Sequence, residues 1–261
     1  MKVARAFAFS LACGFALAAC VGTTGGEVVA FGAQLAGPAE VAGHRLTFTS
    51  GRGLPVTLTK ATVRVGAVYM NRSKPIPVAQ EKSCIATGTY VGEVLGGAEA
   101  DLLAGAPVRF PRGGQGTSEP AVTGELWLNG GDIDALEDKT IVASVEGEVV
   151  LPAGTKAFRG AITFGANRRS AAIDPARPGA DAPCKQRIVA PVPIDLSLAE
   201  GGLLTVRVDP RAWFALVTFD DLREEGGVLV FDDADTNASS IGLADGVRAP
   251  QGVYRFEWAA K

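Results

Sequence analysis

Apolar and polar residues alternate in short stretches along most of the chain, and glycine, proline or asparagine separates one stretch from the next. In residues 61–71, Val63 and Val65 fall on one face of an extended strand, and Val68 and Met70 follow on that face after a break at Gly66. A period of two residues is typical of strands with one buried face. Further stretches of this kind lie at 44–50, 122–129, 140–150, 158–165, 188–198, 203–208, 227–232 and 252–258. The pattern predicts an all-β chain of roughly nine to eleven strands.

Helical signals are few and short. Asp209 is a favoured N-cap residue and precedes Pro210, so the sequence predicts a short helix there. Residues 132–139 are a second candidate for a single helical turn. Neither segment is long enough to cover a sheet, so sheet is expected to pack on sheet in a β-sandwich with one or two short helices. Polar, glycine- and proline-rich segments at 105–120 and 167–183 are predicted to be long loops.

Composition excludes several classes of function. The chain has 25 basic and 28 acidic residues, a net charge of −3, and no cluster of Lys and Arg, so we expect no nucleic-acid partner. His44 is the single histidine, which excludes zinc sites built from several imidazoles, and we expect it at a strand end on the surface. Neither a G-x-S-x-G elbow nor a glycine-rich phosphate loop occurs.

The first residues have the layout of an export signal. Lys2 and Arg5 are followed by an almost wholly apolar run over residues 6–19. A membrane-spanning helix needs roughly 20 apolar residues, and this run is shorter. The run ends in Leu17-Ala18-Ala19-Cys20, which resembles the lipobox of bacterial lipoproteins. The segments 184–196, 208–222 and 252–258 also loosely resemble parts of uncharacterised bacterial lipoproteins, and no activity comes with that similarity.

The lipobox resemblance implies a location and a division of the chain. In that family the cysteine sulfur receives a diacylglyceryl group, the leader is removed, and the new amine is acylated. Residues 1–19 are then the signal peptide, Cys20 carries the lipid, 20–43 are a tether and 44–261 form a single β-sandwich domain. The protein is expected on the membrane of the cell envelope, and on the outer membrane if the cell is Gram-negative, because Val21 and not aspartate follows Cys20. Cleavage near Ala19 without a lipid and use of Cys13 are the alternatives.

Two cysteines remain once the leader and the lipid site are set aside. Cys84 and Cys184 form an even pair in an exported chain, which favours a disulfide bond over two buried thiols. Such a bond would span both predicted long loops and join the two halves of the chain. This favours one integrated domain.

Three sets of residues are candidates for chemistry. Asp233, Asp235 and Asn237 alternate as at the start of a calcium loop, although Ala238 and Ala244 stand where that loop has Gly and Glu; a solvated turn is the alternative. Carboxylates such as Asp132 and Asp134 are eligible for a glycosidase. The tryptophans are candidates for stacking on sugars, although core packing explains them as well, and they are Trp127, Trp213 and Trp258.

Together these features predict a lipid-anchored envelope protein that acts as a non-catalytic binding or structural module. Its expected partners are the membrane, through the N-terminal lipid, and an envelope protein or polysaccharide. The alternatives are a surface enzyme that acts on polysaccharide through paired carboxylates and a calcium-stabilised adhesin. No cofactor is expected apart from that calcium.

The lipid anchor can be tested at Cys20. Replacement Cys20→Ser removes the sulfur that accepts the diacylglyceryl group, so the protein is expected to move from the membrane pellet to the soluble fraction and to lose labelling by radioactive palmitate. Cys13→Ser is the matched control and should change neither measurement. Unchanged fractionation and labelling of the Cys20→Ser protein would show that no lipid is attached there.

Overall fold

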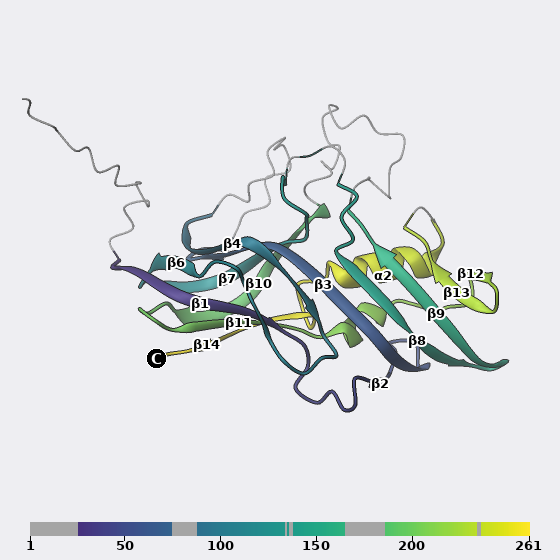
Figure 1. The fold of residues 1–261 in the computed structure, drawn as a ribbon. Helices are drawn as coiled ribbons and strands as arrows, with labels where there is room; N and C mark the ends of the chain where they lie inside the picture. Colours follow the sequence, from purple (N-terminus) through teal and green to yellow (C-terminus); the bar gives the residue numbers. More distant parts are fainter. Residues whose placement is uncertain (1–25, 75–87, 134, 136–137, 165–185, 234–235) are drawn as a thin grey trace, which may run out of the picture.

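A computed structural model describes residues 26–74, 88–133, 135, 138–164, 186–233 and 236–261 (Figure 1). The described part is mostly β-structure and carries fourteen strands, one α-helix and one 3-10 helix. The elements are, in order, β1 (Val28–Ala36), β2 (Leu46–Thr49), β3 (Pro55–Asn71), β4 (Tyr90–Asp101), β5 (Val108–Arg109), β6 (Gly114–Thr117), β7 (Pro120–Trp127), β8 (Ala143–Leu151), β9 (Gly154–Ile162), β10 (Ile188–Ser197), β11 (Leu203–Val208), η1 (Pro210–Phe214), β12 (Arg223–Glu225), β13 (Val228–Phe231), α2 (Ala238–Val247) and β14 (Tyr254–Ala259).

Strand β3, with 17 residues, pairs with four other strands, more than any other strand in the described part. One of its edges pairs with β2 and then β4, and the other pairs with β8 and then β7. From β8 the sheet continues through β9 to β13 and β12, and from β4 it continues through β6 and β1 to β11 and β14. Figure 1 shows β3, β8 and β9 as long neighbouring strands, with β1, β11 and β14 grouped apart from them. Strand β14 contacts β10, so the sheet turns back on itself in a sandwich-like fold.

The predicted alternation in residues 61–71 is confirmed. Val63, Val65, Val68 and Met70 are each 0% exposed and belong to the main core. A β-bulge in β4 lies opposite the break at Gly66, because the register shifts between Val65 and Ala67, where Gly96 and Gly97 stand opposite Gly66. The bulge keeps both halves of this long strand facing the same core.

Two helices close the core at one end of the sheet. The helix predicted at Asp209 is present as η1, and the Asp209 carboxylate accepts a hydrogen bond from the Arg211 amide at 3.0 Å. Helix α2 is not predicted by the sequence. It packs closely on η1, because a Cβ on Gly246 would lie 2.3 Å from the Trp213 carbonyl oxygen. The predicted turn at 132–139 includes residues outside the described part.

Three predictions of detail are wrong. The tether does not extend over 20–43, because residues 28–36 within it form strand β1, which pairs with β5, β6 and β11 inside the sheet. Roughly nine to eleven strands are too few, since short strands such as β5, β6 and β12 offer too few residues to show a period. The segment 105–120 is not one long loop, because β5 and β6 lie within it.

No helix in the described part is long and apolar enough to cross a bilayer.

The aromatic centre of the core is expected to carry much of the stability. Phe158 is 2% exposed, and its ring lies 5.3–5.9 Å from those of Phe214, Phe219 and Phe231. Phe158→Ala should lower the free energy of unfolding by about 3–5 kcal/mol in urea denaturation, through lost burial and the remaining cavity. Leu216→Ala is the control, because Leu216 is 54% exposed and should change stability by less than about 0.5 kcal/mol. A loss below about 1 kcal/mol for Phe158→Ala would contradict this core.

Candidate functional site: a polar trough across the sheet

Most residues predicted for modification or metal binding lie outside the described part of the structure. These are Cys20, Cys84, Cys184 and Asp235. The lipid site, the disulfide bond and the complete calcium loop therefore stay predictions.

The two described members of the calcium motif have other partners. Asn237 is the N-cap of α2, and its side chain accepts a hydrogen bond from the Ser240 amide at 2.7 Å. The Asp233 carboxylate accepts a hydrogen bond from the Thr163 hydroxyl. Residues 238–247, which would supply the second half of the loop, form α2 instead. Among the described residues, no three His, Cys, Asp or Glu side chains gather where they could hold a metal ion.

His44 and two of the three tryptophans occupy structural positions. His44 lies in a turn before β2 with a φ of 59°, and its Nε2 is 3.1 Å from Asp101 Oδ2. Trp213 is 0% exposed and lies in the core. Trp258 is half-buried and its ring meets that of Phe31 edge to face at 5.4 Å. Trp127 is also half-buried, but it lies on the opposite face of the sheet from the core residue Leu126.

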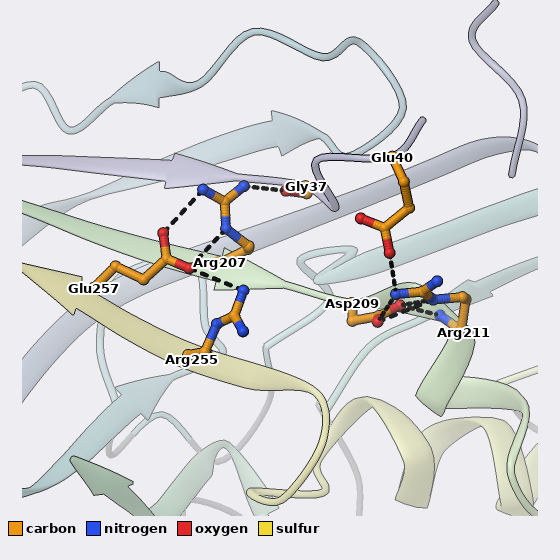
Figure 2. A network of polar contacts seen from close by, with 7 residues as sticks. All are labelled: Gly37, Glu40, Arg207, Asp209, Arg211, Arg255 and Glu257. Carbon is orange, nitrogen blue, oxygen red and sulfur yellow. Dashed lines mark hydrogen bonds and ion pairs between the residues drawn. The ribbon is translucent and has the colours of Figure 1, made fainter. Parts of the chain in front are cut away.

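A network of arginines and carboxylates joins β11, η1 and β14 to the segment that follows β1 (Figure 2). Arg207 donates to both oxygens of Glu257 at 3.0 and 2.9 Å, and to the Gly37 carbonyl at 2.8 Å. Arg255 reaches the same carboxylate at 2.9 Å. Hydrogen bonding to Arg207 lowers the pKa of Glu257, and the pKa of Arg207 is raised by the same contact.

The second half of the network is centred on Arg211. Its Nη2 lies 2.7 Å from a Glu40 oxygen, and its guanidinium also binds Asp209. Hydrogen bonding to Asp209 raises the pKa of Arg211. The network lies beside a cleft of about 470 Å³. It contains three arginines and three carboxylates, so its charges balance. The arrangement fixes residues 37–40 against the sheet and offers no excess charge to a ligand.

A larger trough lies on the face of the sheet opposite the core. It has a volume of about 760 Å³ and crosses β3, β8 and β9. Its floor is a row of small side chains that the strand register places side by side, Thr62, Ser144 and Ala161. The Thr62 and Ser144 hydroxyl oxygens are 2.5 Å apart. Because strands are spaced about 4.8 Å apart, this row runs roughly 10 Å from β3 to β9.

Long charged side chains form the walls of the trough. On one side, Lys60, Glu146 and Arg159 make the next cross-strand row, and Lys60 Nζ is 3.0 Å from Glu146. On the other side, Arg64 is 3.6 Å from a Glu99 oxygen. The trough is therefore hollow because small residues separate two rows of long ones.

The lining of the trough is more basic than acidic. Four basic residues, Lys60, Arg64, Lys139 and Arg159, line it with only two acidic ones, Glu99 and Glu146. Arg159 also binds Glu225 at 2.8 Å, and Glu225 lies outside the lining. Even with Glu225 counted, one positive charge is left over on a chain whose net charge is −3. This excess favours an anionic ligand.

The trough residues carry no motif that marks them in the sequence. Lys60, Thr62 and Arg64 alternate with core valines, so their position on the outer face follows from the period of two. Their neighbours on β8 and β9 depend on the strand register, which a single sequence does not specify. The alternation of β3 was the one available signal.

The Arg207–Glu257 pair predicts a pH dependence of stability. A lowered pKa means that Glu257 stabilises the fold above its unfolded pKa of about 4.3, and that this stabilisation is lost as pH falls through the folded value. Because both side chains are partly exposed, Glu257→Gln should cost only about 0.5–1 kcal/mol at pH 7. The difference from wild type in urea denaturation should therefore shrink as pH falls below the unfolded pKa of about 4.3. Most of the stability loss caused by Glu257→Gln should also disappear when Arg207 is already replaced by Gln. If Glu257→Gln costs the same with and without Arg207, then Arg207 is not the cause of the loss.

Comparisons of the chain with protein-family profiles, with curated proteins and with solved structures find no match. The trough is therefore interpreted from the residues of this chain.

Proposed function

We propose that this chain is a lipid-anchored protein of the cell envelope that acts as a non-catalytic binding module, and that its trough binds an extended anionic polymer. The observation that carries the proposal is the basic excess in a trough of about 760 Å³ on a chain with net negative charge. The lipid is expected on Cys20, and the location follows from it.

The trough is suited to binding because its walls stand on paired strands in the sheet. β3 and β8 pair over residues 56–63, and β8 and β9 pair over residues 143–162. Ion pairs between neighbouring strands hold the wall side chains in place, as between Lys60 and Glu146. A ligand therefore meets charges whose positions are largely set in advance, which reduces the entropy lost on binding.

An extended ligand fits the shape of the trough better than a compact one. The floor row crosses three strands, and the hollow is open along the sheet face and not enclosed. The strands of the floor pair with neighbours on both edges, so an incoming peptide has no free edge to extend as an added strand. Recognition must therefore come from side chains, mainly through charge and hydroxyl groups.

The carboxylates in the trough favour binding over hydrolysis. A glycosidase needs two carboxyl groups that face each other across the substrate. Glu99 and Glu146 each lie against a basic side chain, at 3.6 and 3.0 Å. Of the acids considered from sequence, Asp132 has interactions of its own, and Asp134 lies outside the described residues.

Charge removal in the trough tests the proposal. Polygalacturonate and polyglutamate are the probes, because both are extended polymers of carboxylates on different backbones. The double variant Lys139→Gln/Arg159→Gln should bind both about tenfold more weakly in isothermal titration calorimetry, since each lost charge contact is worth about 0.5–1 kcal/mol. Binding by wild type should also weaken as salt rises.

The matched control removes the same charge elsewhere. Arg52→Gln/Arg255→Gln alters two exposed residues that do not line the trough, and it should leave both affinities within about twofold. Equal weakening by the two double variants would mean that net charge alone governs binding. Absence of binding by wild type to either polymer would refute the proposed function.

A further inference from the structure

A second hollow adjoins the trough along β3 and lies between β4 and β7. It has a volume of about 310 Å³ and is lined by five glycines in three short segments, together with Tyr69, Leu95 and Trp127. We call it the aromatic cleft. Arg64 lines both the trough and the aromatic cleft, so the two hollows meet at this side chain.

The cleft is hollow because a β-bulge places glycines where side chains would otherwise stand. The register between β3 and β4 shifts at this point, so that Gly66 lies against Gly96 and Gly97. Both β4 glycines have positive φ values, 87° and 25°, which side chains rarely adopt. Gly66 has no room for a side chain either, because a Cβ there would lie 2.0 Å from Asn129 Oδ1.

Aromatic rings form the wall of the cleft. The rings of Tyr69 and Trp127 are 4.8 Å apart, and Tyr69 meets Tyr90 at 5.3 Å. Tyr69 and Trp127 lie on the outer face of the sheet, because their chain neighbours Val68 and Leu126 are in the core. They are only partly buried, so each keeps some ring surface open to a ligand.

A buried carboxyl group fixes the indole ring. Trp127 Nε1 donates to Glu125 Oε1 at 2.6 Å, and Glu125 is 0% exposed. Burial raises the pKa of Glu125, and the hydrogen bonds from Trp127 and Tyr90 act against that shift. The amide of Asn129, 1% exposed, similarly holds the turn below the ring by donating to the Gly131 carbonyl at 2.7 Å. The wall and the floor of the cleft are thus preorganised.

We infer that the aromatic cleft is a subsite for a sugar ring, and that the ligand of the trough is an acidic polysaccharide. This inference rests on the proposed function of the trough. The apolar CH face of a pyranose stacks on the Trp127 and Tyr69 rings, while its carboxylate faces the Arg64 guanidinium at the junction with the trough. The next residues of the polymer then extend along the basic trough. An acidic peptide satisfies the basic residues equally well but has no ring to place in the cleft.

Binding of two hexamers tests the inference. Hexagalacturonate and hexaglutamate with an acetylated N-terminus and an amidated C-terminus carry six carboxylates each, and the purified full chain is titrated with each. Trp127→Leu should lower the affinity for hexagalacturonate about fivefold, because the stacking surface is lost, and should leave the affinity for hexaglutamate within about twofold. The change in tryptophan fluorescence on binding hexagalacturonate should also disappear.

A second variant guards against misfolding of Trp127→Leu. A Cβ built on the exposed Gly131 has no atom within 4 Å, so Gly131→Tyr can place a ring at the rim of the cleft with no clash at its Cβ. This variant should keep the melting temperature of wild type. It should lower the affinity for hexagalacturonate but not the affinity for hexaglutamate. Unchanged hexagalacturonate affinity in both variants would overturn the sugar subsite.

The two proposals fail in different ways. If Lys139→Gln/Arg159→Gln lowers the affinity for both hexamers while the cleft variants lower neither affinity, the trough binds anions and the sugar subsite is wrong. If the trough variant weakens neither hexamer, the proposed function itself is wrong.

Discussion

Pairing along both edges of β3 is the constraint on which the rest of the structure depends. One strand of 17 residues holds β2 and β4 on one side and β8 and β7 on the other, and the sheet divides into its branches there. So long a strand twists away from a single core unless something resets its register. The bulge opposite Gly66 does this, and it keeps Val63 and Val68 in one core. The same bulge creates the aromatic cleft on the other face, so packing and the proposed binding surface share one origin.

How much of the fold the sequence predicts depends on the length and surroundings of each element. The all-β fold class and the core face of β3 follow from the alternation of apolar and polar residues. The 3-10 helix η1 follows from Asp209 and Pro210. Strand β1 was missed although Val29, Phe31, Ala33 and Leu35 alternate and are buried, because its position near the predicted leader favoured a tether. Helix α2 was missed for a different reason. Seven of its ten residues are buried, and small residues on several sides leave no polar face to set a helical period.

The candidate site was less predictable than the fold. Alternation places Thr62 and Arg64 on the outer face of β3, but a trough exists only because β8 and β9 bring Ser144 and Ala161 into the same row. Register between distant strands depends on packing over the whole sheet. The described carboxylates between 219 and 237, which stand out in the sequence, do not line the trough; Glu225 and Asp232, for example, form ion pairs with Arg223. Local density of acids was therefore a poor guide to the binding surface.

If Cys20 carries the proposed lipid, the early start of β1 limits how far the domain can stand from the membrane. Strand β1 begins at Val28, eight positions after Cys20. A fully extended chain of that length spans at most about 30 Å, whereas a connection running to residue 43 would allow roughly 80 Å. With a lipid on Cys20, the sheet is confined to a layer close to the bilayer surface. A trough held in that layer can meet polymers that lie along or near the membrane, and it cannot reach material farther out in the envelope.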